Sequence, residues 1–352
     1  MSQESSLRIG HACSYTPLAL IHSAGCTPYR ILPSGDAPDR AGQLLHDNLC
    51  PHVKRILDRA LDDDLPDLYG MVFMNCCDAM RRLSDAWRAA RPSDKVVLVD
   101  LPVSTLPSSI TFFAHELTRL SRTLSEWTGR SIGSPDVARS VDAVDEMADL
   151  LDTVSKRARA GTLEGGSARL QDLFNRAATE PIDGTVELLR TVAGEPECPK
   201  PGSHLTPIYL FGNVLPDPEA FAFFHSCGVH VADDSVCTGL RAFRRIGGDD
   251  SESVFMRLAR GLLDSSRCPR TFDPSRPGKI AEDILLKARA CQAKGVIGST
   301  MKFCDPYMSR LPAIRTLLRE AGLPLLLLEG DCTLRSIGQQ RTRIEAFAEM
   351  LG

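Results

Sequence analysis

Alternation of strand-like and helical segments constrains the fold of this chain more than any other sequence feature. The apolar run LYGMVFMN (68–75) precedes DAMRRLSDAWRAA (78–90), which has helical spacing, and the apolar run KVVLVDLP (95–102) follows. Such a strand–helix–strand unit places its strands parallel in one sheet with a right-handed crossover. Asp78 is suited to cap the amino end of the helix.

The same alternation returns in the C-terminal part of the chain. Between the two parts, residues 111–190 are helical and polar, and the Pro-rich and Gly-rich stretch 193–204 is typical of a linker. Strands are expected at 206–212, 229–234, 295–300 and 323–329, with helices at about 217–228, 252–264, 280–294, 311–322 and 336–351.

These patterns predict the α/β fold class, with two sheets separated by a helical region. A chain of 352 residues exceeds the size at which one hydrophobic core usually stops growing. We therefore expect an N-terminal α/β domain (1–125), a helical region and linker (126–203) and a C-terminal α/β domain (204–352).

Charge and hydropathy argue against two classes of partner. The chain carries 41 Lys and Arg against 45 Asp and Glu, a net charge of −4, so it lacks the basic field that nucleic-acid binding needs. Its apolar runs are shorter than the ~20 residues of a membrane span. The N-terminus has neither the basic start nor the apolar stretch of a secretory signal, and we expect a cytoplasmic protein.

Twelve cysteines need an explanation, because a reducing cytoplasm does not favour structural disulfides. Several follow the carboxyl ends of predicted strands, where open parallel sheets bind their ligands: Cys76, Cys77, Cys237, Cys304 and Cys332. Two others, Cys50 and Cys268, precede prolines at element boundaries. No such placement applies to Cys13, Cys198, Cys227 and Cys291.

Thiolates placed before helix N-termini are stabilised by the positive end of the helix dipole, which suits metal ligation. The chain has no CxxC pair, so neither a zinc ribbon nor a ferredoxin-like cluster is indicated. Dispersed single cysteines would have to converge by folding. The alternative that each of them is an inert buried thiol stays open at this point.

Motifs spread over nearly the whole chain carry a family resemblance. They are IHSAGCTPYRI (21–31), LCPHVKRILDRAL (49–61), NCCDAMRRLSDAW (75–87), LPVSTLPSS (101–109), VADDSVCTGLRAF (231–243), RCPRT (267–271), KGVIGSTMKFCDPY (294–307), GLPLLLLEGDCT (322–333) and GQQRTRIEAFAEML (338–351). With these motifs the sequence resembles the 2-hydroxyacyl-CoA dehydratase and benzoyl-CoA reductase family.

The resemblance implies two flavodoxin-like or Rossmann-like doubly wound domains with a [4Fe-4S] cluster in the cleft between them. The matching ligands are Cys50, Cys77 and Cys304, which leave one iron position free for the substrate. It also implies an ATP-hydrolysing iron–sulfur activator protein that supplies one electron for the radical dehydration of a 2-hydroxyacyl-CoA. A homodimer, or a heterodimer with a homologous subunit, and an anaerobic, oxygen-sensitive enzyme are expected on the same basis.

Two alternatives remain within the same family, because this chain departs from a simple three-cysteine member. Cys76, Cys237 and Cys268 are three further thiols, and a related branch of the family holds a double-cubane [8Fe-9S] cluster with six cysteines and reduces small molecules. The chain would then be an ATP-dependent reductase. A third hypothesis is a non-catalytic partner subunit of such a complex.

Four other residues are candidates for roles near the substrate. His22 and Ser23 lie in a segment that the family places near the cleft, where a histidine can donate a proton. Arg341 and Arg343 begin the last predicted helix. They suit either a contact across a domain interface or the binding of a CoA phosphate.

Overall fold

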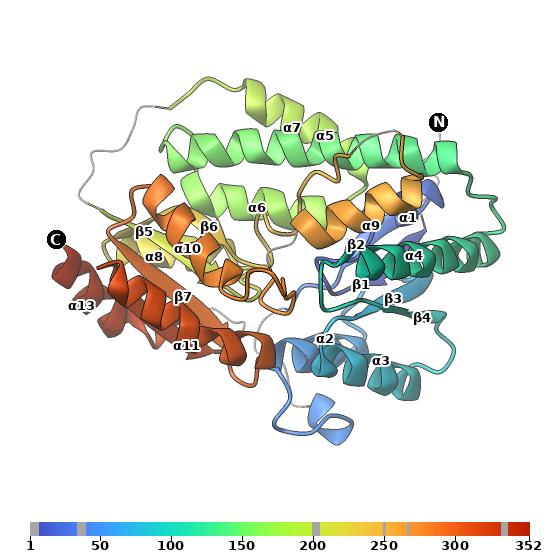
Figure 1. Ribbon diagram of the computed structural model, residues 1–352, viewed down its shortest axis with the longest axis horizontal. Coiled ribbons are helices and arrows are strands. Elements are labelled where there is room, and N and C mark those ends of the chain that lie inside the picture. Colours follow the sequence, from blue (N-terminus) through green and yellow to red (C-terminus); the bar gives the residue numbers. More distant parts are fainter. Residues whose placement is uncertain (1–6, 34–39, 199–204, 249–250, 266–267, 332–336) are drawn as a thin grey trace.

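Two parallel sheets of four strands form the framework of the protein (Figure 1). The computed structural model describes residues 7–33, 40–198, 205–248, 251–265, 268–331 and 337–352. The first sheet contains β1 (Arg8–His11), β2 (Thr27–Arg30), β3 (Gly70–Asn75) and β4 (Val96–Asp100). The second contains β5 (Thr206–Gly212), β6 (Val229–Ser235), β7 (Gly295–Met301) and β8 (Leu325–Gly330).

The two sheets share one strand order. The first runs β2-β1-β3-β4 and the second β6-β5-β7-β8, so each follows the order 2-1-3-4 of a flavodoxin-like fold. In such a sheet the order reverses between the first and third strands, and ligands bind outside the carboxyl ends of the strands there. The predicted α/β class with two doubly wound sheets is confirmed.

Helices cover both faces of each sheet, and four of them, α4–α7, stand between the two sheets in the order of the chain. Their bounds are α1 (Leu18–Ser23), η1 (Ala41–Gln43), α2 (Pro51–Leu61), α3 (Asp78–Ala90), α4 (Pro107–Thr128), α5 (Ser134–Arg159), α6 (Gly166–Thr179), α7 (Ile182–Gly194), α8 (Pro218–Ser226), α9 (Val254–Ser265), α10 (Lys279–Ala290), α11 (Asp305–Glu320) and α13 (Arg341–Leu351). The expected helical region thus corresponds to α4–α7.

Alternating side chains on the strands explain this layering. In β3, Phe73 packs on the face covered by α2 and α3, whereas Val72 joins the core formed with α4 and α5. In β5, Leu210 packs with α8 and α13, and Phe211 packs with α10 and α11. Both faces of each sheet are therefore buried, as is usual for parallel sheets.

The long helix α5 and its neighbours α6 and α7 lie together at one side of the molecule (Figure 1). Helix α9 packs against α4 and α5, although it belongs to the C-terminal part of the sequence. The division at 125 and 203 therefore stays a prediction, because this helix crosses it.

Two of the local differences between the sequence interpretation and the structure bear on the site. Strands β1 and β2 were not expected, because RIGH and TPYR are four-residue segments with polar residues and lack an apolar run. Helix α3 begins at Asp78, and its N-cap is Cys77. The expectation that Asp78 caps the helix is wrong by one position, which places a thiol at the helix N-terminus.

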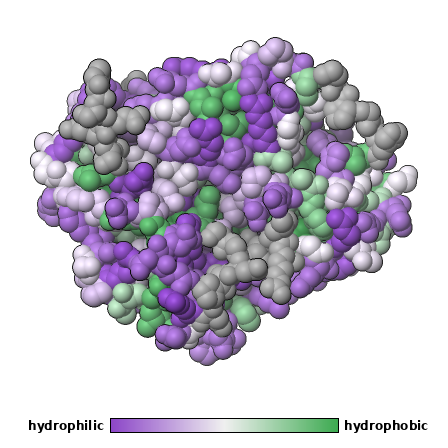
Figure 2. Space-filling view, turned by 180° about the vertical axis from the view of Figure 1, so that it is seen from behind, coloured by the Kyte–Doolittle hydropathy of each residue, from purple (hydrophilic) through white to green (hydrophobic). Residues whose placement is uncertain are grey.

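One face of the molecule is predominantly polar. Figure 2 shows hydrophilic residues over most of one face, with hydrophobic residues in small separate groups. Within the described ranges, no helix combines the length and the apolar composition that crossing a bilayer requires.

Candidate functional site

A cavity of about 100 Å³ lies where the carboxyl ends of the two sheets meet. Its walls come from the loops after β1, β3, β5, β6 and β7 and from the start of α2. Both points of strand-order reversal, β1/β3 and β5/β7, open onto it. The topology therefore brings the ligand-binding edges of both sheets to one place.

Seven cysteines line this cavity, and they include every cysteine that the sequence predicts as a ligand. They are Cys13, Cys50, Cys76, Cys77, Cys237, Cys268 and Cys304. Cys13 was not expected there, because the strand that it follows, β1, was not recognised. Cys332, which also follows a predicted strand, lies outside the described residues.

Three of the cysteines stand at helix N-termini. Cys50, Cys77 and Cys304 are the N-cap residues of α2, α3 and α11. The backbone N–H groups at the start of a helix carry partial positive charge, and those of Ala79, Met80 and Tyr307 lie next to the Cys77 and Cys304 sulfurs. Three positive helix ends therefore face one cavity, and they favour negative charge in it.

The environment of Cys77 favours its thiolate. A hydrogen bond from the neighbouring Cys76 lowers the pKa of Cys77 against the opposing effect of burial. The backbone N–H groups of Met80 and Ala79 and the positive charge of Arg270 lower it further. Hydrogen bonds with Cys13 and then with Cys77, together with burial, raise the pKa of Cys76 well above its usual value. The two adjacent thiols are thus distinct in chemistry.

Asn213 forms hydrogen bonds that position Cys304 in the cavity wall. Its Nδ2 donates to Cys304 Sγ at 3.2 Å, and its Oδ1 accepts from the Met301 backbone N–H at 3.0 Å. Burial raises the pKa of Cys304, and the hydrogen bonds from the Tyr307 backbone and from Asn213 oppose this. Gly212 precedes Asn213, and a Cβ at Gly212 would meet the Ser299 carbonyl oxygen at 2.0 Å, so only glycine fits there.

Two buried arginines lie next to the cavity. Arg30 donates from Nη1 to the Cys237 carbonyl oxygen at 2.7 Å and from Nη2 to Cys237 Sγ at 3.1 Å. Arg241 donates to the Ser235 and Gly212 carbonyl oxygens and to the Tyr307 hydroxyl. In the described parts of the chain, neither guanidinium pairs with a carboxylate.

Burial and the nearby arginines give Cys237 and Cys268 very different pKa values. Burial alone would raise the pKa of Cys237, but Arg30 and Arg241 outweigh it, and together with Ser14 they lower this pKa to about 6. Burial raises the pKa of Cys268 to about 12. At neutral pH the cavity therefore holds at least one thiolate opposite buried positive charge.

Arg270 ties the Cys268 loop to the first sheet. It donates to the backbone carbonyl oxygens of Cys76 at 2.9 Å, Pro102 at 2.5 Å and Leu101 at 3.1 Å. The Phe272 N–H adds a bond to the Val103 carbonyl oxygen at 2.7 Å. These contacts position two cysteine-bearing loops from distant parts of the sequence beside each other.

The donor set fits a polynuclear iron–sulfur cluster better than a single metal ion. Among the described residues, no three His, Cys, Asp or Glu side chains gather closely enough to ligate one ion. The thiols instead surround a cavity several times larger than the ~10–15 Å³ that one water needs. In a cubane [4Fe-4S] cluster each thiolate ligates a different iron, so spaced cysteines are what such a cluster requires.

His22 and Ser23 lie in α1 and do not line the cavity. His22 Nδ1 lies 3.1 Å from Ser140 Oγ, and its Nε2 lies 3.6 Å from Asp183 Oδ1. Ser23 donates to the Leu20 carbonyl oxygen at 2.8 Å. These contacts join α1 to α5 and α7, and a catalytic role for either residue stays a prediction.

The bonds that the structure describes for Arg341 and Arg343 stay within their own half of the protein. Arg341 bonds Glu345 and Ser226, and Arg343 bonds Gln340 and the Leu327 carbonyl oxygen. The expectation of a contact across the domain interface is therefore wrong for the bonds that the structure describes. Arg30 and Arg270 make such contacts instead.

Comparison with known proteins gives a match along almost the whole chain. The family described as 2-hydroxyglutaryl-CoA dehydratase, D-component, matches residues 13–351. The chain is 22% identical to the (R)-phenyllactyl-CoA dehydratase beta subunit of Clostridium sporogenes, over 100% of this chain and 93% of that protein.

Two further relatives show similar coverage. The lactoyl-CoA dehydratase beta subunit of Anaerotignum propionicum is 21% identical over 96% of this chain and 90% of its own length. A benzoyl-CoA reductase subunit of Thauera aromatica is 22% identical over 89% of this chain and 82% of its own length. All three relatives are named as subunits of larger enzymes.

Proposed function

The chain belongs to the 2-hydroxyglutaryl-CoA dehydratase D-component family, and from this premise we propose that it is the cluster-carrying subunit of a 2-hydroxyacyl-CoA dehydratase-like lyase. Cys50, Cys77 and Cys304 would hold a [4Fe-4S] cluster in the cavity between the two sheets. Their common position, as N-caps of three helices that converge on one cavity, is the observation that carries this proposal.

Electrostatics support an anionic group in this cavity. A buried charge is costly unless it is paired, yet Arg30 and Arg241 are 2% and 3% exposed and face thiols. Three helix N-termini add positive partial charge from other directions. A thiolate-ligated cluster supplies negative charge at the point where these groups meet.

The residues around the site would bind the cluster, orient its cysteine ligands and shield it from water. When bound, such a cluster supplies a Lewis-acidic iron and a one-electron donor for a thioester carbonyl. Asn213 fixes Cys304 by a hydrogen bond to its sulfur, and Arg270 fixes the backbone beside Cys77. The cavity walls include Val53, Val214 and Met80, whose apolar side chains would limit the access of water to a bound cluster.

We further propose that the chain acts with partners. The relatives named above are single subunits of multi-subunit enzymes, which supports assembly with a homologous subunit or a second copy. An ATP-hydrolysing iron–sulfur activator would deliver the electron, and the acyl-CoA would be the substrate. We place this oxygen-sensitive complex in the cytoplasm of an anaerobic cell.

A double-cubane [8Fe-9S] reductase of small molecules is the second candidate. It is favoured by the position of Cys76, Cys237 and Cys268 on the same cavity as the first three cysteines. Arg30 also holds the Cys237 sulfur at 3.1 Å and stabilises its thiolate, as a ligand would need. Burial raises the pKa of Cys268, so iron binding there would have to displace its proton.

The proposed function is tested with the native complex, purified without oxygen from its source together with its partner subunit and activator. Dehydration of (R)-2-hydroxyacyl-CoA thioesters is measured with ATP and a reductant. Cys304→Ala should abolish turnover and lower the iron content. Cys291→Ala, at the half-buried C-cap of α10 and outside the cavity, is the matched control and should change neither. Full activity of the Cys304→Ala complex would instead identify this chain as a non-catalytic partner subunit.

A further inference from the structure

Strand β8 forms an open edge of the second sheet. It pairs with β7 on one side, and within the described residues no strand pairs with its other side. The Pro324 carbonyl oxygen accepts from Val296 N and the Gly330 carbonyl oxygen from Lys302 N, so these residues turn their backbone toward β7. Because the direction alternates along a parallel strand, Leu325 and Leu327 turn theirs toward the open edge.

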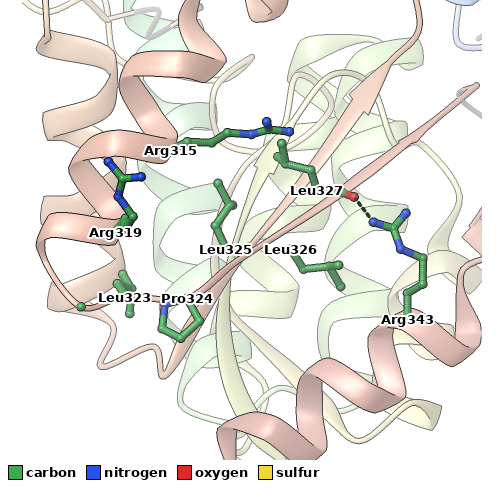
Figure 3. Close-up of a pocket in the computed structure, with 9 residues that line it drawn as sticks. Arg315, Arg319, Leu323, Pro324, Leu325, Leu326, Leu327 and Arg343 are labelled. Atoms are coloured by element: carbon green, nitrogen blue, oxygen red, sulfur yellow. Dashed lines mark hydrogen bonds between the residues drawn. The ribbon is translucent and has the colours of Figure 1, made fainter.

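A hydrogen bond confirms this alternation. Arg343 Nη2 donates to the Leu327 carbonyl oxygen at 2.9 Å from the open side (Figure 3). The Leu325 N–H and carbonyl groups and the Leu327 N–H group have no partner among the contacts of the described residues. An exposed edge with free backbone groups is a template for an added strand.

A groove of about 590 Å³ runs along this edge. Figure 3 shows Arg315 and Arg319 of α11 on one side of the strand and Arg343 of α13 on the other. The leucines of β8 form its floor. Leu325 and Leu327 pack toward α11, and Leu326 packs toward α13. The groove therefore offers apolar contacts on both faces of any strand that enters it.

The charge of the groove is uniformly positive. Its lining residues include three arginines and no acidic residue. Arg315 and Arg319 have no hydrogen-bond or ion-pair partner within the described chain. They stand four residues apart on one helix face, an arrangement of like charges that destabilises a helix unless an anion lies nearby.

We propose that this groove binds an extended, acidic segment of a partner protein, which adds to β8 as a fifth strand. The backbone edge would give affinity, and carboxylates opposite Arg315 and Arg319 would give selectivity. A second copy of this chain fits less well, because two β8 edges brought together would place the arginines of both copies against one another.

This site is separate from the cysteine cavity. The two share no lining residue, and the groove flanks the amino-terminal half of β8 whereas the cavity lies at carboxyl ends of strands. The inference therefore stands whether or not the cluster proposal does. If the cluster proposal fails, the protein lacks iron; if the groove proposal fails, peptide binding is absent while the iron content is unchanged.

The test measures fluorescence anisotropy of the full chain with labelled ten-residue peptides. The probe alternates valine and glutamate, a second peptide has lysine in place of glutamate, and a third has alternate backbone nitrogens of the probe methylated. We expect saturable binding of the probe alone, at least tenfold weaker for Arg315→Glu/Arg319→Glu. Arg122→Glu, at an exposed position on α4, is the matched control and should bind as the wild type does.

Several outcomes would overturn the proposal. Equal binding of the methylated peptide would show an anion site without strand addition, and equal binding by the charge-reversed variant would place the peptide elsewhere. Absence of binding at millimolar probe, or a change in the oligomeric state of the Arg315→Glu/Arg319→Glu variant, would also contradict it. Iron content should be the same in all variants.

Discussion

Arg30 Nη2 lies 3.1 Å from Cys237 Sγ, and Arg30 Nη1 lies 2.7 Å from the carbonyl oxygen of the same residue. Arg30 ends β2 of the first sheet, and Cys237 follows β6 of the second. One side chain thus both joins the two halves of the protein and sets the charge of a thiol in the cavity between them. Its guanidinium is buried, so water does not screen this effect.

Replacement of Arg30 by methionine should raise the pKa of Cys237 from about 6 toward its ordinary value of 9.0, because only Arg241 and Ser14 would then oppose burial. The thiolate fraction at pH 7 would therefore fall. Alkylation of Cys237 in cluster-free protein, followed by peptide mass spectrometry, should slow several-fold. Arg40→Met, at an exposed arginine paired with Asp62, is the control. An unchanged rate in Arg30→Met would contradict the account.

The Asn213 bond to Cys304 should tune the reduction potential of the bound cluster. A hydrogen bond to a ligand sulfur stabilises the more negative, reduced state, so its loss should lower the potential. For Asn213→Leu we expect a decrease of about 40 mV, the one-electron equivalent of about 1 kcal/mol. Redox titration monitored by electron paramagnetic resonance measures it. Asn175→Leu, at a half-buried asparagine bound to the Pro216 carbonyl oxygen, should leave the potential unchanged.

His11 should make the protein sensitive to mild acid. Burial and the charge of Arg30 lower the pKa of this imidazole to about 3, below its ordinary 6.5. A lowered pKa contributes stability above 6.5, and this contribution is lost as the pH falls toward 3. At pH 5 the loss is about 2 kcal/mol. Urea unfolding of cluster-free His11→Leu should show a smaller difference between pH 7.5 and pH 5 than the wild type shows. An equal difference would rule out His11 as its source.

Cys76 and Cys77 separate the two cluster hypotheses. In a single-cubane protein Cys77→Ser should lower the iron content, whereas Cys76→Ser should be nearly silent. In a double-cubane protein both substitutions should remove iron. The variants are compared by iron and sulfide analysis after anaerobic reconstitution, with Cys227→Ser, a buried thiol outside the cavity, as the control. A Cys77→Ser protein with full iron content would contradict both hypotheses.

Much of the fold could be predicted because its central strands are continuous apolar runs. Segments such as GMVFMN in β3 and TPIYLFG in β5 are buried on both faces, and their nearly continuous apolar composition indicates this burial. Strands β1 and β2 could not be recognised, since His11 and Arg30 are polar and the four-residue segments that contain them lack an apolar run. Arg30 is buried against Cys237 of the second half, a long-range contact that local sequence does not encode.

The cysteine site could be predicted in part for a geometric reason. Thiols that follow parallel strands must gather at one sheet edge, and this rule places Cys77, Cys237 and Cys304 together. The same rule applies to Asn213, which follows β5, so its place at the cavity could have been predicted as well. Arg241 carried no comparable signal, because nothing in its sequence neighbourhood indicates a buried guanidinium.

The central claim, that the cysteines of this cavity hold an iron–sulfur cluster, is tested most directly by iron and acid-labile sulfide analysis of anaerobically reconstituted protein. The account predicts about four irons per chain, or about eight for a double cubane, and loss of this iron in the Cys50→Ser/Cys77→Ser/Cys304→Ser variant. A colourless wild-type protein without iron, or a triple variant that keeps its iron, would contradict it.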